Sequence, residues 1–439
     1  MPVLVKRVLK QLAVKSLPTK QAAFALLREL TGVLSGGLET YAPALLVKVT
    51  DSLSTAGSPS MTTEALAFLG AFFATHPVAV YASALPTLVE RIVQLTQDKQ
   101  QKVSAEAMSV LAELTRSIRP DPTVALPAEL SAVVEQIFVA TSALFKGGLA
   151  DADVRIKAVE TLSDIVFFFG DVLGGQMPVA LELLGSALSN DSLRLTAVRG
   201  VQRVAQSEVV AGAEAESWLG ELVKTLPGTL RRGSRTYKAD GFRALDAVLL
   251  RSVHGSLLVQ SLQLTHASYP PISSSRLGES LSATAVPALV TDLQPFITEQ
   301  DLYNLPLALN VITVLLATQP AAKAVVEAEI LPRVYALVRT PLITGLPLEA
   351  VLAFFEALIA PDQELALKVI PELLKVVGKE KTLANAAAGE AQATRTTAKC
   401  VGVVVKAAPR DRAGVIAEFA KQIEVRAAVS SLRRHRVEP

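Results

Sequence analysis

The chain contains few of the residues from which covalent cross-links and metal sites are built. Its 439 residues include one cysteine, Cys400, and four histidines. A disulfide within the chain is therefore excluded, and a cysteine and histidine metal cage cannot readily be assembled. The sequence predicts no metal or other cofactor, and Cys400 is expected to be a buried structural thiol rather than a reactive one.

The chain also has no large excess of one charge, because 43 basic residues are balanced by 41 acidic ones and leave a formal net charge of +2. This balance supplies no global field for a polyanion, so no nucleic-acid partner is expected. The run from Ala65 to Val89 has no charged residue and is long enough to span a bilayer. His76 and Pro77 in its middle favour two helices joined by a turn, and hence no membrane partner.

Motifs of catalysis are absent as well. The sequence has no G-x-S-x-G, no glycine-rich phosphate loop and no H-E-x-x-H. His254 and Ser256 share the string "HGSLL", but no acid is positioned beside them. We therefore predict that the chain is not an enzyme and takes no small-molecule substrate.

What the sequence does have is alanine, leucine and valine at a recurring spacing. Pairs of a small residue and a larger apolar residue four positions later lie at Ala23/Leu27, Ala65/Leu69, Ala107/Leu111, Ala158/Leu162, Ala197/Val201, Gly241/Leu245, Ala308/Ile312 and Ala350/Phe354, and Ala398/Gly402 matches only at its small residue. Seven of the eight spacings between small residues lie between 39 and 51, and the other is 67. This period is near the roughly 40–47 residues of helical HEAT repeats.

A second recurring element is a proline just inside an apolar stretch, as in "QMPVALELLGSAL" and "VIPELLKVV". Proline is tolerated in the first turn of a helix. We therefore predict that each unit consists of a helix A, a short turn, a helix B with proline in its first turn, and a loop. In "DADVRIKAVETLSDI", Asp153 is placed to cap helix A. The small residue would let helix A approach its neighbour closely.

These units predict an all-α HEAT-repeat (armadillo-like) solenoid of about nine helix pairs in a curved superhelix, with helices B on the concave side. A globular bundle of unrelated helices is the alternative, and the regular spacing disfavours it. We expect HEAT repeats over 1–265 and 285–425, and a loop or disordered insertion within a repeat at 266–284. An atypical tail at 426–439 lacks a polar capping repeat, which suggests a fragment, a split gene product or an aberrant end.

The densest basic run in the interior of the chain is "RRGSRTYK", which brings Arg231, Arg232, Arg235 and Lys238 into one short turn region before a helix A. It is either a solvated loop or a contact with an acidic partner. Arg91 is a further candidate partner contact, from its expected exposure on a helix B.

Several strings resemble the middle of the cullin-associated and neddylation-dissociated proteins. They include "KTLPGTLRRGSRTYKADGFRALDAVL", "LPRVYALVRTPLITGLPLEAVLAFFEALI" and "QKVSAEAMSVLAELTRSIRP". They keep the family's order over nearly the whole chain, although the insertion from His266 and the text after "IEVR" depart from the family.

The resemblance implies a non-catalytic scaffold. Proteins of this family clasp the unneddylated cullin-RING scaffold and exchange the substrate receptors of SCF-type ubiquitin ligases. We therefore expect a cullin-RING scaffold as protein partner and a cytoplasmic or nuclear location, or both. A generic HEAT scaffold of transport or phosphatase type is the alternative.

The repeat register can be tested at Ala23. If Ala23 is a close-contact position, Ala23→Leu should overpack the contact between helices and lower the free energy of unfolding by about 1–3 kcal/mol. Urea unfolding followed by circular dichroism measures this change. An unchanged midpoint would show that the assigned register is wrong.

Overall fold

The computed structural model describes residues 2–54, 58–146, 151–251, 285–375 and 388–408, with short stretches at 413–414, 416–417, 419–421 and 424. All regular structure in these ranges is helical. The chain divides into two compact units, Met1–Trp218 and Leu219–Pro439. The predicted insertion at 266–284, the predicted tail at 426–439 and His254 lie outside the described residues.

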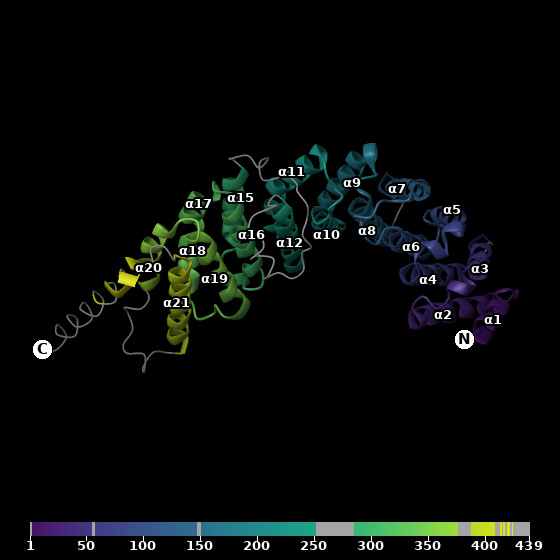
Figure 1. The fold of residues 1–439 in the computed structure, drawn as a ribbon, viewed down its shortest axis with the longest axis horizontal. Coiled ribbons are helices and arrows are strands. Elements are labelled where there is room, and N and C mark those ends of the chain that lie inside the picture. Colours follow the sequence, from purple (N-terminus) through teal and green to yellow (C-terminus); the bar gives the residue numbers. More distant parts are fainter. Residues whose placement is uncertain are drawn as a thin grey trace. The chain divides into compact units, whose positions relative to one another are not determined.

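Two layers of helices make up the first unit, as Figure 1 shows from purple to teal. One layer consists of helices A, each packed on the next: α2 (Leu17–Leu34), α4 (Pro59–Thr75), α6 (Gln101–Ile118), α8 (Ala152–Phe169) and α10 (Arg194–Ala205). The other layer consists of helices B, which also pack in chain order: α1 (Pro2–Leu12), α3 (Ala42–Ser54), α5 (Leu85–Leu95), α7 (Ser131–Lys146) and α9 (Met177–Ser189). The following α11 (Ala213–Leu230) contains the boundary between the units.

The second unit repeats this alternation. Its helices A, again each packed on the next, are α12 (Arg235–Arg251), α16 (Leu305–Thr318), α19 (Gly345–Ile359) and α21 (Ala388–Ala407). Its described helices B are α15 (Ala285–Leu293), the pair α17 (Ala322–Val325) and α18 (Leu331–Val338), and α20 (Ala366–Leu374). With nine helices A in the described residues, the predicted all-α solenoid of about nine units is confirmed.

The helices form where the sequence supplies caps and an apolar stripe. In α8, the carboxylate of Asp151 accepts a hydrogen bond of 2.6 Å from the Ala152 amide, and Asp151 has extended backbone angles. Asp151 is therefore the N-cap. The expectation that Asp153 caps this helix is wrong, because the helix begins one residue before Asp153, which lies in the first turn. Ala158 and Leu162 are buried as the pattern requires.

The predicted close-contact residue is buried in seven of the nine helices A. The register is wrong in the last two, where Ala350 is half-buried and Ala398 is exposed. In α21 the buried stripe is instead Ala393, Thr396, Thr397, Cys400, Val401 and Val404. Two of its members are threonines, so the apolar pattern alone places the buried face one or two positions away from where it lies.

Side chains also tie one helix A to the next at intervals near one repeat. The hydroxyl of Ser117 on α6 donates to the Phe73 carbonyl of α4 at 2.8 Å. The hydroxyl of Ser207, just after α10, donates to the Phe167 carbonyl of α8 at 2.7 Å. These bonds satisfy carbonyls near the ends of α4 and α8, where partners within the helix run out.

Proline opens helix B as predicted in α3, α5, α9 and α15, where it is the second or third residue. Pro332 is second in α18, which continues directly from a π-helical turn, Val326–Ile330. The prediction is wrong for α20, because a 3-10 turn at Gln363–Leu365 starts the helix earlier and leaves Pro371 inside it.

The uncharged run at 65–89 is divided as predicted, since α4 ends before His76 and α5 begins at Leu85. In the described part of the chain, one window, Ala128–Phe145, is long and apolar enough to cross a membrane. Half of this window is buried within the fold, and α7 packs on α5 and α8. Length and composition alone are weak evidence of a membrane span.

Gly241 tests the close approach directly. A Cβ added there would lie 2.3 Å from Cδ2 of the fully buried Leu230. Gly241→Ala should therefore lower the free energy of unfolding by about 1–3 kcal/mol, despite the better helix propensity of alanine. A Cβ on Gly220 of α11 meets no atom within 4 Å. The control Gly220→Ala should be neutral or stabilising by up to about 1 kcal/mol, and equal effects of the two substitutions in denaturant titrations would contradict the assigned contact.

Candidate interaction sites

The predicted basic run lies at the start of α12. Arg231 and Arg232 follow the end of α11, whereas Arg235 and Lys238 belong to the first turn of α12. The prediction of one turn region is therefore right for Arg231 and Arg232 and wrong for Arg235 and Lys238, which are helical. The helix begins early because the Ser234 hydroxyl accepts a hydrogen bond of 3.3 Å from the Tyr237 amide, the arrangement of an N-cap.

Arg235 and Lys238 line an open cleft of about 410 Å³ together with residues 299–303. The guanidinium carbon of Arg235 lies 4.0 Å from the ring centroid of Tyr303, which is 49% exposed. The Lys238 ammonium lies 5.8 Å from the Phe296 ring. An arginine stacked on a partly exposed tyrosine is a pairing enriched at the centres of protein interfaces. The cleft is therefore a candidate contact for a protein partner.

The other predicted residues have different surroundings. Arg231 forms an ion pair of 2.6 Å with Asp292 of α15, and Arg232 is exposed in the turn. An exposed pair of this kind contributes about 0–1 kcal/mol to stability. Arg91 lies in the first unit on α5, where it is half-buried and donates a hydrogen bond of 2.8 Å to Gln94. The structure thus brings Arg235 and Lys238 into one site, and Arg91 belongs to the other unit.

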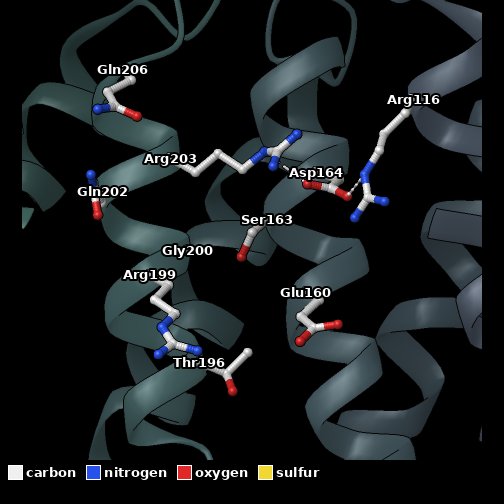
Figure 2. A pocket seen from close by; sticks show the side chains of 10 residues that line it. All are labelled: Arg116, Glu160, Ser163, Asp164, Thr196, Arg199, Gly200, Gln202, Arg203 and Gln206. Carbon is white, nitrogen blue, oxygen red and sulfur yellow. Dashed lines mark hydrogen bonds and ion pairs between the residues drawn. The ribbon is translucent and has the colours of Figure 1, made fainter. Parts of the chain in front are cut away.

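A charged network in the first unit has no counterpart in the sequence predictions. Figure 2 shows Asp164 of α8 between Arg116 of α6 and Arg203 of α10. The Nε atom of each arginine lies 2.8 Å from a different oxygen of the Asp164 carboxylate. Arg116 also contacts Glu113 on its own helix at 2.5 Å. Three successive helices A are therefore joined through one carboxylate.

Burial dominates the electrostatics of this network. The Asp164 side chain is 3% exposed, and its desolvation raises the pKa of the carboxyl group. The guanidinium groups of Arg203 and Arg116 oppose that rise. Desolvation in turn lowers the pKa of Arg203. The signal in the sequence is the spacing of the three residues, 48 and 39 positions or about one repeat each, but charged residues do not belong to the apolar pattern that marks the repeats.

Cys400 is buried on α21, as predicted. Desolvation raises the pKa of its thiol to about 12. Among the residues that the structure describes, no group of three or more histidine, cysteine, aspartate or glutamate side chains is placed to hold a metal ion.

Comparison with solved structures identifies the class of protein. An engineered protein aligns over 97% of this chain and 98% of its own, with a TM-score of 0.54 and 15% identity. Kap121p, in a crystal structure bound to Nup53p, aligns over 97% of this chain and 39% of its own, with a TM-score of 0.50 and 14% identity. At this identity the likeness shows the fold alone, which is a solenoid of helical repeats.

Comparison with sequences leads to a family. A family model described as "CAND1-like, TPR repeats" matches residues 36–162. Cullin-associated NEDD8-dissociated protein 1 of Drosophila melanogaster is 26% identical over 93% of this chain and 32% of its own length. Protein 2 of Mus musculus is 28% identical over 94% of this chain and 31% of its own length, and protein 1 of Arabidopsis thaliana is 26% identical over 92% and 31%.

These matches support a HEAT-repeat region of the cullin-associated NEDD8-dissociated family, as the sequence resemblance predicted. The spacing of 42 residues between Ala23, Ala65 and Ala107 is that of HEAT repeats rather than the roughly 34 residues of tetratricopeptide repeats. The chain spans about a third of the length of the curated relatives that it matches.

The surroundings of Cys400 predict an unreactive thiol. A thiol with a pKa of about 12 carries almost no thiolate at neutral pH, and this one is also buried. Ellman's reagent at about pH 8 should therefore not react with the native chain, whereas it should release one equivalent of chromophore in guanidinium chloride, where the thiol pKa returns to about 8.5. Rapid reaction of the native protein would show that α21 does not bury this side chain.

Proposed function

We propose that the chain is a non-catalytic scaffold that binds a cullin lacking its ubiquitin-like modifier, and that it takes part in the assembly or exchange of cullin-RING ubiquitin ligases. A single observation carries the proposal. The relatives named cullin-associated NEDD8-dissociated proteins align along 92–94% of the chain rather than over one short motif.

The repeat architecture suits this role. A solenoid presents a long surface on which a partner can lie, and its repeats need no catalytic group to do so. The chain corresponds to about a third of the length of its relatives. We therefore propose that it supplies part of the surface that binds the partner rather than the complete exchange activity. A cytoplasmic or nuclear location, or both, belongs to the same proposal.

The cleft at the start of α12 is the contact that we propose for the second unit. Arg235 and Tyr303 form a stacked pair that is partly exposed, and Lys238 adds a second positive charge. Stacking on Tyr303 restricts the Arg235 side chain before a partner arrives, which lowers the entropy cost of binding. Glu299 and Asp301 line the same cleft, so a partner surface that carries both acidic and basic groups would complement it.

Purified components test the proposal. The chain is immobilised and offered a purified cullin, with and without the covalent modifier. We expect retention of the unmodified cullin and weaker retention of the modified form. Failure of the folded chain to retain the unmodified cullin would contradict the proposal. Retention of a small GTPase or a phosphatase subunit instead would support the generic HEAT scaffold of transport or phosphatase type.

Charge reversal tests the proposed contact. Arg235→Glu removes the stacked cation and adds an acid, so the dissociation constant for the cullin should rise by at least about tenfold, the effect of losing one charge-assisted contact. The matched control is Lys399→Glu, an equal charge change at an exposed position on α21 of the same unit. Equal affinities of the two variants in a titration would place the contact elsewhere.

A further inference from the structure

The Asp164 network borders an open groove of about 300 Å³ between α8 and α10. Figure 2 shows Arg203 and Arg199 on the α10 side of this groove, with Glu160 and Asp164 across from them on α8. The groove lies wholly within the first unit. Its residues belong to none of the candidate contacts described above.

Arg203 is held in place by the protein itself. Its Nε atom is paired with the buried Asp164 carboxylate, and its guanidinium carbon lies 4.9 Å and 5.3 Å from the ring centroids of Phe167 and Phe168. The side chain is nevertheless 36% exposed. In the part of the chain that the structure describes, its Nη groups make no hydrogen bond. A restrained arginine with available donors is prepared to bind an anionic group at little entropic cost.

The Asp164 network joins three helices but contributes little to the free energy of folding. A buried carboxylate shared by two arginines gains little stability over apolar packing, because desolvation offsets the Coulomb attraction. What it does provide is a fixed position for the guanidinium group of Arg203. The close approach of the helices contributes as well, since a Cβ on Gly200 would lie 2.2 Å from the Ser163 hydroxyl. Side chains on α8 and α10 therefore reach the same narrow space.

The charges and donors of the groove favour a carboxylate. Arg116 is already paired with Glu113, and Glu160 with Lys157, so the charged donors that we assign to a ligand are the Nη groups of Arg203. The fork of one guanidinium group matches the two oxygens of a single carboxylate. Gln202 and Gln206 also line the groove and lie four positions apart, so they share one face of α10. Their amide groups can donate hydrogen bonds to the same anion.

We propose that the groove between α8 and α10 binds an aspartate or glutamate side chain from an acidic segment of a protein partner. Arg203 forms the charge-assisted hydrogen bonds, and Asp164 acts as a positioning residue that holds Arg203. The two glutamine amides complete the donor set. This site adds a partner contact beyond the cleft at α12, and it does not require that the partner be a cullin.

The test uses the full chain and two fluorescent peptides, one of alternating glutamate and glycine and the other with glutamine in place of glutamate. We expect the glutamate peptide to bind more weakly as salt is added, and the glutamine peptide to bind at least about tenfold more weakly than the glutamate peptide. Absence of binding by the glutamate peptide, or equal binding of the two peptides, would overturn the proposal.

The groove is altered without breaking the Asp164 network by Gln202→Glu combined with Gln206→Glu. These acids should repel the glutamate peptide and raise its dissociation constant by at least about tenfold. The control is Gln11→Glu combined with Gln136→Glu, an equal charge change at exposed positions of the same unit. Thermal melting establishes that both variants are folded. Equal peptide affinities of the two folded variants would overturn the site.

The cullin experiment on the same proteins keeps the two proposals separate. A chain that binds the glutamate peptide through the groove but retains no cullin supports the site and contradicts the proposed function. A chain that retains cullin but binds the glutamate and glutamine peptides equally supports the proposed function and contradicts the site in the groove.

Discussion

The packing of each helix A on the next is the interaction on which the rest of the structure depends. A pair of helices cannot bury both of its apolar faces by itself, so each repeat is stable only against its neighbours. Small residues on helices A allow this close approach, and Gly200 of α10 shows how little space remains, because an added Cβ would meet the Ser163 hydroxyl of α8. The same stacking brings residues about 40 positions apart in the sequence into direct contact.

The packing of helices A also brings the charged residues of the Asp164 network together. Arg116, Asp164 and Arg203 lie on three successive helices A, and each would be a surface residue on an isolated helix pair. Stacking buries the carboxylate and leaves the arginines at the edge of a groove. Two guanidinium groups oppose the desolvation that raises the pKa of Asp164 but do not cancel it, so the network holds its geometry at some cost in stability. Function in such a fold arises from the surface that stacking creates.

The fold could be predicted far more fully than the sites. Period, composition and proline positions were sufficient for the all-α solenoid, because those features repeat and errors in one copy do not affect the others. The candidate cleft was predicted in part, since Arg235 and Lys238 were recognised by their charge. Tyr303, which holds Arg235, lies 68 positions further along the chain, and no local pattern connects the two.

By itself, the sequence determined that this protein is an array of helix pairs with Ala23, Ala65 and Ala107 at equivalent positions, and that Cys400 has no cysteine partner. The physical reason is that helix periodicity, close packing and covalent chemistry are properties of residues and their spacing. Only the tertiary structure decided that Ala398 faces outward and that Asp164 holds two arginines. These features depend on the rotation of each helix against its neighbours, which the packing of the whole array sets.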